Sequence, residues 1–317
     1  MIKNKNKKSV IFQMDPFNKL NISSDTSISL IKEAIKRDIE VWISNPHNLS
    51  YENNKAFTIA HRVLTRELKI CLPQKKDLNK FDFFFIRQDP PFDLNYLTNC
   101  YLLEMHKKFN KKPFFVNDPS GIKNFTEKIF PLYFNDLMPK NCITESKEVF
   151  LSMLKRHRKL VIKTLYNKGG EGVAKVLNTR QKEALTIFEG LKKKYSVPVV
   201  VQEFIDNVVY GDKRVILIDG KPEGFINRIP KKGEFKANLH LGGKAEKTTL
   251  TKKEEKICST IKKTLREEKL FFVGIDLINE KLTEINVTSP TGIVQIFELS
   301  GINLAKKLWT KLLYKVN

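Results

Sequence analysis

Near its carboxyl end the chain carries two short apolar runs separated by a polar turn. The runs cover residues 271–278 and 282–287, and Asn279, Glu280 and Lys281 lie between them. Two such runs around a short polar break are typical of a β-hairpin. A hairpin is an antiparallel strand pair, so this stretch requires a sheet at this point of the fold.

Three polar side chains interrupt the two apolar strands: Asp276, Glu284 and Asn286. Glu284 and Asn286 are two positions apart, so their side chains share one face of the strand. A three-residue turn pairs Ile278 with Leu282 and places Asp276 directly opposite Glu284. A register slip of one residue would move these side chains to the other face.

Two carboxylates on one strand pair repel each other unless a cation lies between them. Oxygen ligands without His or Cys suit Mg²⁺, which takes one or two carboxylates and leaves its other positions to water and phosphate oxygens. The pattern therefore favours a magnesium–nucleotide site. The alternative is a solvated hairpin face whose acids pair with Lys or Arg. The small hydroxylated loop at 288–292, which follows the acidic strand, favours a site that binds a polar substrate.

The composition bounds the class of protein. The 317 residues are enough for two or three domains, and a hydrophobic content of 41% excludes a largely disordered chain. No apolar run approaches the roughly 20 residues of a membrane span, and the run at 10–14 is too short for a signal peptide. The four cysteines are scattered, as in reduced cytosolic proteins. We therefore predict a cytoplasmic protein without a membrane partner.

The formal charge of +22 is unusually high. It is compatible with a nucleic-acid partner or another anionic surface. However, the lysines are spread along the whole chain and are not interleaved with aromatic residues in one segment. We interpret the charge as a compositional bias and expect no nucleic-acid partner, although positive charge would help to attract a polyphosphate ligand.

The first part of the chain alternates between expected strands and helices. Strands are expected at 9–14, 39–43, 81–86 and 114–116, and helices at 25–37 and 93–109, whereas 45–76 shows no clear pattern. This alternation predicts a parallel α/β sheet, in which ligands bind at the carboxyl ends of the strands. Asp15, Arg87 and Asp89 follow such ends. Considered alone, Asp15 is better explained as part of a strand-ending Asp-Pro pair. Arg87 precedes a stiff Pro-Pro loop and is a candidate for binding an anion.

The pattern changes after a junction at 113–124. We expect a helix at 126–134 that carries Lys128, and a strand at 160–163 that ends in Lys163. A glycine-rich turn at 168–172 follows, in which backbone N–H groups can approach phosphate oxygens closely. The turn lacks the spacing of a P-loop and, considered alone, could be only a hairpin turn. The two lysines supply point charges for phosphates.

The remaining segments add a second group of strands. Helices are expected at 179–194, 251–268 and 302–313, and strands at 198–204, 212–218 and 224–228. The strand end at Gln202-Glu203 could offer backbone groups and an acid to adenine. Asp212 and Arg214 are two positions apart in the sequence. A surface ion pair between them would also explain these two residues. The long polar stretch 229–243 is typical of a lid or of a disordered loop.

Several motifs together resemble a known family: MDP at 14–16, RQDPPFD at 87–93, GDKR at 211–214, RIP at 228–230, VGID at 273–276 and LTEINVTSPT at 282–291. Over nearly its whole length the chain resembles the ATP-grasp superfamily and, more narrowly, prokaryotic glutathione synthetases. The resemblance implies an α/β fold with an N-terminal parallel α/β (pre-ATP-grasp) substrate-binding domain at 1–123. A two-lobed ATP-grasp domain at 124–317 follows, with a nucleotide lobe at 124–203 and a lobe at 204–317 that holds the lid and the metal site.

The resemblance also implies the activity. The family joins γ-glutamylcysteine to glycine and converts ATP to ADP and phosphate, with Mg²⁺, or Mn²⁺ in its place, as the metal. The cysteinyl carboxylate would attack the γ-phosphorus, and the amine of glycine would then displace phosphate from the acyl phosphate. The family further implies a homo-oligomer, a tetramer.

Matched residue by residue, the family assigns roles to positions of this chain. The nucleotide-binding positions are Lys128, Lys163, Lys168, Gly169, Gly170, Gln202, Glu203, Ile205 and Asp212. The metal-binding positions are Asp276, Glu284 and Asn286. The cationic catalytic positions are Arg214 and Arg228. The substrate-binding positions are Arg87, Asp89, Ser289, Pro290 and Thr291.

The chain departs from the family pattern at two loops. The lid reads KANLHLGG at 236–243, where the family typically has RGNLAAGG, and Asn167-Lys168 stands where Gly and Met are common. These changes affect the expected turnover rate and lid mobility more than nucleotide binding. Two other functions remain open, namely another ATP-grasp carboxylate–amine ligase or a nucleic-acid binder on an inactive ATP-grasp scaffold. The intact set of Asp276, Glu284 and Asn286 argues against the second.

Overall fold

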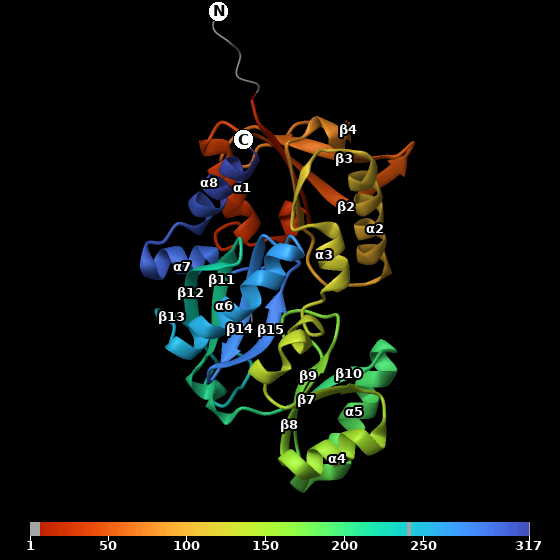
Figure 1. Cartoon of the computed structure of the whole chain (residues 1–317), viewed down its shortest axis with the longest axis vertical. Coiled ribbons are helices and arrows are strands. Elements are labelled where there is room, and N and C mark those ends of the chain that lie inside the picture. The colour runs from red at the N-terminus through yellow and green to blue at the C-terminus, as the bar shows by residue number, and fades with distance from the viewer. Residues whose placement is uncertain (1–6, 240–241, 317) are drawn as a thin grey trace, which may run out of the picture.

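The computed structural model describes residues 7–239 and 242–316, and its strands form three sheets. Figure 1 shows a six-stranded sheet at the top, a five-stranded sheet in the middle and a four-stranded sheet at the bottom. The expected α/β class is confirmed, but parallel pairing is confined to the first sheet. The other two sheets are antiparallel.

The first sheet has the strand order β4-β3-β2-β1-β5-β6. Its strands are β1 (Ser9–Met14), β2 (Glu40–Glu52), β3 (Lys55–Val63), β4 (Gln74–Asp77), β5 (Phe83–Arg87) and β6 (Phe114–Val116). The accompanying helices are α1 (Thr26–Lys36), α2 (Leu94–Phe109) and α3 (Pro119–Asn124). The side chains of Asp25 and Asp93 accept hydrogen bonds from the first turns of α1 and α2, as expected of N-cap residues.

The segment 45–76, in which no clear sequence pattern is present, extends this sheet with antiparallel strands. β2 runs on to Glu52 through an irregularity between Ser44 and Leu49, and it pairs with β3. Asn53 and Asn54 turn the chain with φ values of 49° and 62°. Asparagine tolerates this left-handed backbone better than most residues, so the turn allows a tight hairpin.

The four-stranded sheet has the order β7-β10-β8-β9. Its strands are β7 (Asn141–Thr144), β8 (Lys159–Thr164), β9 (Val173–Leu177) and β10 (Val199–Glu203), and two helices, α4 (Lys147–His157) and α5 (Gln181–Tyr195), pack on it. The rings of Phe150 and Phe188 stack with their centroids 4.4 Å apart and join the two helices over the sheet.

The helix expected at 126–134 is wrong. Glu127 to Ile129 form turns, and a 3₁₀ segment follows at Phe130–Leu137. Pro131 explains the difference, because proline has no N–H to donate and disfavours α-helical backbone at the preceding residue. Lys128 therefore lies on an irregular segment between the sheets.

The five-stranded sheet has the order β13-β12-β11-β14-β15. Its strands are β11 (Asp212–Ile218), β12 (Lys221–Ile229), β13 (Lys244–Glu246), β14 (Phe272–Ile278) and β15 (Lys281–Asn286). The helix α6 (Lys252–Glu267) begins with a capping box between Thr251 and Glu254, and α7 (Ile293–Ser300) and α8 (Leu304–Val316) end the chain. The short 3₁₀ segments lie at Phe17–Lys19, Leu78–Lys80, Asn178–Arg180 and Asp206–Tyr210.

The six-stranded and five-stranded sheets share one apolar core, which α8 helps to form. Trp309 of α8 packs edge-on against Phe83 at 5.5 Å, and its indole N–H donates to the carbonyl of Leu30 at 2.9 Å. The buried side chain of Asn117, just after β6, bonds the backbone of Phe272 and Val287 at 2.7 Å. These contacts fix the β14–β15 hairpin against the carboxyl end of the parallel strands.

Across residues 7–239 and 242–316, none of the helices combines the length and the apolar character that a membrane crossing needs.

Candidate active site

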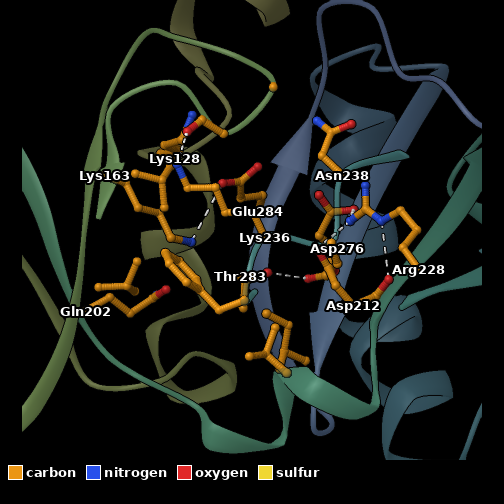
Figure 2. A pocket seen from close by; sticks show the side chains of 18 of the residues that line it. Lys128, Lys163, Gln202, Asp212, Arg228, Lys236, Asn238, Asp276, Thr283 and Glu284 are labelled. Atoms are coloured by element: carbon orange, nitrogen blue, oxygen red, sulfur yellow. Dashed lines mark hydrogen bonds and ion pairs between the residues drawn. The ribbon is translucent and has the colours of Figure 1, made fainter. Parts of the chain in front are cut away.

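A cavity lies between the four-stranded and five-stranded sheets (Figure 2). It contains about 1020 Å³ of empty space, part of which is open to solvent. Lys128, Lys163 and Gln202 line it from one side, and Asp212, Arg228 and Asp276 from the other. The cavity thus collects residues that lie up to 159 positions apart in the chain, from Glu127 to Asn286.

The β14–β15 hairpin pairs Asp276 with Glu284, as the sequence predicts. The turn is nevertheless shorter than expected. Lys281 already pairs with Ile278, and only Asn279 and Glu280 reverse the chain, with φ values of 49° and 59°. A bulge at Thr283 then restores the pairing of Asp276 with Glu284.

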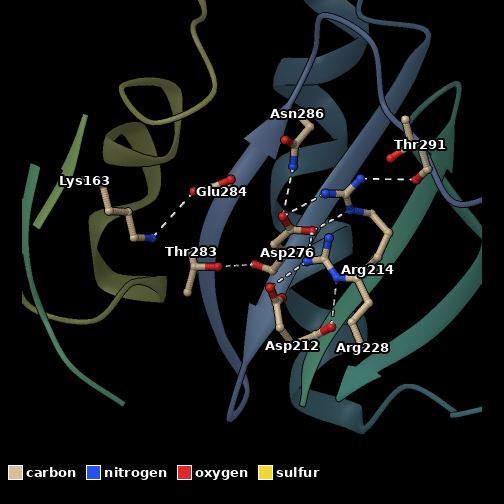
Figure 3. A network of polar contacts seen from close by, with 9 residues as sticks. All are labelled: Lys163, Asp212, Arg214, Arg228, Asp276, Thr283, Glu284, Asn286 and Thr291. Carbon is tan, nitrogen blue, oxygen red and sulfur yellow. Dashed lines mark hydrogen bonds and ion pairs between the residues drawn. The ribbon is translucent and has the colours of Figure 1, made fainter. Parts of the chain in front are cut away.

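Asp276 is the centre of a buried ion cluster (Figure 3). Its Oδ1 lies 2.5 Å from Nε of Arg214 and 3.0 Å from Nη2 of Arg228, and its Oδ2 lies 2.9 Å from Nη2 of Arg214. Arg228 also donates to Oδ2 of Asp212 at 2.6 Å. Two cations and two carboxylates therefore balance each other in this cluster. The surface ion pair that the sequence allowed between Asp212 and Arg214 is not formed, because each residue pairs across to a neighbouring strand.

The cluster sets the protonation of its acids. Burial alone would raise the pKa of Asp276, but the adjacent charges of Arg214 and Arg228 hold it well below its usual value. Burial raises the pKa of Asp212 to about 6, against the opposing effect of Arg228. Burial would lower the pKa of Arg228, but the two carboxylates raise it instead. Arg228 thus remains cationic beside the cavity.

Glu284 and Asn286 occupy the edge of this cluster. Figure 3 shows Glu284 turned toward Lys163, whose Nζ lies 3.7 Å from Oε1, while Asp276 turns toward the arginines. The amide nitrogen of Asn286 donates to Oδ2 of Asp276 at 3.2 Å, so its amide oxygen points away from Asp276. Glu284 and the oxygen of Asn286 are hard oxygen donors that fit Mg²⁺. Within the part of the chain that the structure describes, no three His, Cys, Asp or Glu side chains form a metal cluster, so phosphate oxygens or water would have to complete the shell.

The glycine loop closes one side of the cavity. Gly169 and Gly170 have φ values of 68° and 82°, a backbone conformation that favours glycine. The ammonium of Lys128 donates to the carbonyl of Asn167 at 2.7 Å. Lys236, which belongs to the expected lid, donates to the carbonyl of Gly170 at 3.0 Å. The lid and the glycine loop therefore meet over the cavity.

The lid itself was expected at 229–243. Its first residue, Ile229, ends β12, and the described part forms turns and irregular backbone, as expected for a lid. Two residues of the lid motif, His240 and Leu241, lie outside the described residues.

The opposite end of the cavity is formed by the end of β10. Gln202, Glu203 and Ile205 all line it, as expected for an adenine-binding segment. Phe204 and Phe235 pack edge-on at 5.7 Å and add an aromatic wall that the sequence did not indicate. Nε2 of Gln202 and Oδ1 of Asp212 are buried without a hydrogen-bond partner among the described residues. Buried polar atoms normally have partners, so these two atoms fit a polar ligand such as a nucleoside.

The predicted substrate-binding residues lie next to the cavity, between the hairpin and the first sheet. Buried Arg87 donates to Ser27 at 3.0 Å and to the carbonyl of Pro290 at 3.1 Å. Asp89 accepts hydrogen bonds from Ser289 and from Lys168 of the glycine loop. The structure thus brings all five predicted residues together, with Asp15 beside Asp89.

Arg214 connects these residues to the nucleotide side. Its Nη1 donates to the carbonyl of Thr291 at 3.2 Å, while its other nitrogens hold Asp276 (Figure 3). A charged group shared by both regions is well placed where two substrates would meet.

Family models divide the chain in two. The model described as "Prokaryotic glutathione synthetase, ATP-grasp domain" matches residues 127–301, and the one described as "Prokaryotic glutathione synthetase, N-terminal domain" matches residues 9–123. Together they cover most of the sequence. This chain belongs to the prokaryotic glutathione synthetase family. It is an ATP-grasp ligase, and the resemblance inferred from the motifs is confirmed.

Curated glutathione synthetases match nearly the full length. The glutathione synthetase of Mesorhizobium japonicum is 38% identical over 305 residues, which cover 95% of this chain and 96% of the relative. The glutathione synthetase of Prochlorococcus marinus subsp. pastoris is 37% identical over 310 residues, which cover 96% and 98%.

Solved structures share the fold at much lower identity. The D-cycloserine synthetase DcsG has a TM-score of 0.67 at 12% identity and covers 96% of this chain and 99% of its own. The D-alanyl-alanine synthetase A of Vibrio cholerae has a TM-score of 0.61 at 14% identity, with 98% of each chain covered. An ATP-grasp ligase, PsnB, solved with Mg and ADP, has a TM-score of 0.62 at 13% identity and covers 97% and 98%. ATP-grasp ligases use ATP and Mg²⁺, in agreement with the cofactors expected for this glutathione synthetase family member.

Sequence reasoning also missed Lys236 and Glu127, whose side chains contact other segments at the cavity. Lys236 was noted only as a departure in the lid, and nothing indicated that it reaches the glycine loop. Glu127, next to Lys128, accepts a hydrogen bond from Thr288 at 2.6 Å. Neither contact follows a helix or strand spacing, so no local pattern could have found it.

Proposed function

We propose that this chain joins γ-glutamylcysteine to glycine, with ATP converted to ADP and phosphate through an acyl phosphate. The main support is the double contact of Arg214, which holds Asp276 at the cavity and the carbonyl of Thr291 in the predicted dipeptide loop. One cation thereby adjoins both the nucleotide cavity and the neighbouring substrate region. A carboxylate placed there would face the end of a triphosphate.

The nucleotide would lie along the cavity, from the aromatic wall to the lysines. We assign the adenine to Gln202, Glu203 and Ile205, and the ribose to Asp212. We assign the phosphates to Lys128, Lys163 and the glycine loop with Lys168, Gly169 and Gly170. Lys236 adds a cation from the lid. Four ammonium groups that line one cavity and lie on separate segments suit a polyphosphate.

We assign the metal to Glu284 and Asn286, with Asp276 beside them. Bound Mg²⁺, or Mn²⁺ in its place, would neutralise phosphate charge and polarise the γ-phosphoryl group. In the structure Asp276 is already paired with two arginines. We therefore expect Asp276 to hold Arg214 and Arg228 in position, and Glu284 to be the principal carboxylate ligand.

The dipeptide would be held by Arg87, Asp89 and the loop with Ser289, Pro290 and Thr291. Its cysteinyl carboxylate oxygen attacks the γ-phosphorus, and ADP leaves. The amine of glycine then attacks the acyl carbon, and phosphate leaves. Arg214 and Arg228 stabilise the negative charge that develops on the transferred phosphoryl group and on the acyl oxygen. The lid and the glycine loop exclude water, which would hydrolyse the acyl phosphate.

An ADP-release assay coupled to detection of the peptide product tests the proposed reaction. We expect ADP release to require γ-glutamylcysteine, glycine and Mg²⁺ together, and to stop when EDTA removes the metal. The matched variant is Glu284→Gln, for which we expect a loss of turnover of several orders of magnitude. Turnover with D-alanine alone would instead indicate another ATP-grasp ligase. Salt-sensitive binding to DNA without ADP release would indicate a nucleic-acid binder.

We also propose that the chain has two domains, at 1–123 and 124–317. We further propose that it assembles as a homotetramer, as the family implies. Light scattering of the purified chain tests the assembly, and a mass of one chain would contradict it.

A further inference from the structure

Glu127 is a cavity residue to which none of the motifs assigns a role. Its Oε1 accepts a hydrogen bond from Oγ1 of Thr288 at 2.6 Å, and its backbone carbonyl accepts one from the N–H of Ile285 at 3.1 Å. Thr288 immediately precedes the loop that we assign to the dipeptide. The carboxylate of Glu127 therefore lies where the nucleotide cavity meets the substrate region.

The environment of Glu127 differs from that of the other acids in the cavity. Six carboxylates line it, namely Glu127, Glu171, Glu203, Asp212, Asp276 and Glu284. Five of them lie within 4.0 Å of a nitrogen of Lys, Arg or His. Among residues 7–239 and 242–316, Glu127 has no such cation, and its side-chain hydrogen bond is to a hydroxyl group. Glu127 can therefore take up a proton without breaking an ion pair.

The charges around Glu127 come from several elements. Burial raises the pKa of Glu127, and the negative charge of Glu284 raises it further, while Lys128, the Thr288 hydroxyl and Arg214 act in the opposite direction. The charge of Glu127 also helps to raise the pKa of the buried Tyr96 on α2, although burial is the larger cause. A carboxylate with a raised pKa is a better proton acceptor than an ordinary one.

Amide formation needs such an acceptor, because the attacking amine must lose a proton as it becomes an amide. We propose that Glu127 is the general base for the amine, an assignment that rests on the proposed ligase function. The amine nitrogen forms the C–N bond, and its proton moves to the Glu127 carboxylate. The bond between the acyl carbon and the phosphate oxygen breaks, and phosphate leaves with that electron pair. Glu127 then releases the proton to water.

Replacing glycine by hydroxylamine tests this role. Hydroxylamine is mostly unprotonated at neutral pH and attacks acyl phosphates without strong base assistance, whereas the amine of glycine is far more basic. In Glu127→Gln we expect kcat with glycine to fall about 10²- to 10⁴-fold, the usual contribution of a general base. Hydroxamate formation from γ-glutamylcysteine, ATP and hydroxylamine should fall less than about tenfold, since it bypasses that step.

The pH profile gives a second readout. With glycine, wild-type kcat should rise with pH as Glu127 loses its proton, and this acidic limb should disappear in Glu127→Gln. Thr288→Val, which keeps the carboxylate but removes its hydrogen bond, should keep the limb with a smaller loss of rate. Glu52→Gln, which changes an exposed acid on β2, is the control for charge and should match wild type.

An equal loss with both nucleophiles, or an unchanged acidic limb in Glu127→Gln, would overturn the general-base assignment and leave Glu127 a structural residue. Failure of the proposed function gives a different result, since the wild-type chain would then form no hydroxamate from γ-glutamylcysteine at all.

Discussion

Replacing Asp276 with asparagine should separate the two roles of the acidic hairpin. Asp276 is 4% exposed, and its two oxygens receive four contacts, from Arg214, Arg228 and Asn286. Asparagine keeps the shape but removes one negative charge and one acceptor. The cluster then contains two buried arginines and only one carboxylate, Asp212.

The size of the effect follows from this imbalance. Removal of one partner from a buried ion pair typically costs about 3–5 kcal/mol, because an uncompensated charge remains in a poorly solvated place. The corresponding change at Glu284 differs. Its side chain is 22% exposed and lies 3.7 Å from Lys163, so Glu284→Gln should change stability by less than about 1 kcal/mol. Both variants should lose ligase turnover.

Denaturant-induced unfolding of wild type and of both variants measures the two changes in the free energy of unfolding. The comparison requires that the free energy depends on denaturant concentration with the same slope in all three proteins. The expected result is an unstable, inactive Asp276→Asn and a stable, inactive Glu284→Gln. If Asp276→Asn is as stable as wild type, the arginines do not depend on Asp276. If Glu284→Gln is equally destabilised, Glu284 is part of the same structural cluster and not a separate ligand position.

Three further predictions test other parts of the site. Lys236→Ala should increase ADP release that is not matched by peptide product, because the lid loses its bond to the glycine loop, and equal coupling would contradict this. Gln202→Met removes a buried amide nitrogen that has no partner, so it should raise the free energy of unfolding by about 1 kcal/mol. The same change should weaken ATP binding measured by calorimetry. Unchanged binding would rule out the adenine assignment. The pKa of Asp276 is lowered, so its stabilising effect is complete above the ordinary value of 3.8 and is lost as pH falls below it. The difference in free energy of unfolding between wild type and Asp276→Asn should therefore narrow below about pH 4. A difference that does not change with pH would mean that the ion cluster contributes nothing.

Local signals were sufficient to predict much of the fold. The caps at Asp25, Asp93 and Thr251 mark helix starts because each side chain bonds its own first turn, which depends on neighbouring residues alone. The 3₁₀ segment after Glu127 was mistaken for a helix although Pro131 was visible in the sequence. The strands between 45 and 76 were missed because polar residues interrupt them: β3 reads KAFTIAHRV and β4 reads QKKD, so neither contains a continuous apolar run.

The hairpin shows how a correct pairing can follow from an incorrect turn. The sequence predicted Asp276 opposite Glu284 across three turn residues, whereas the structure has a two-residue turn and a bulge at Thr283. The shorter turn and the extra bulged residue compensate each other, so Asp276 still lies opposite Glu284. A left-handed Glu280 and a bulge are both consequences of packing that residue types alone do not indicate.

The sequence was sufficient to predict which residues form the site, but not which of their side chains pair with one another. Family motifs identified Asp212, Arg214, Arg228 and Asp276, and the structure brings all four together. Which acid pairs with which arginine depends on strand order and cross-strand register. These relations join residues far apart in the sequence, and they decide that Asp276 is neutralised while Glu284 faces the cavity.

The central claim is that one carboxylate is activated by phosphoryl transfer beside the hairpin. It can be tested with γ-glutamylcysteine labelled with ¹⁸O in the cysteinyl carboxylate. If that oxygen attacks the γ-phosphorus, each ligation transfers one labelled oxygen to inorganic phosphate, which mass spectrometry detects. Unlabelled phosphate, with all the label retained in peptide or water, would contradict the acyl-phosphate mechanism and the arrangement of the site proposed for it.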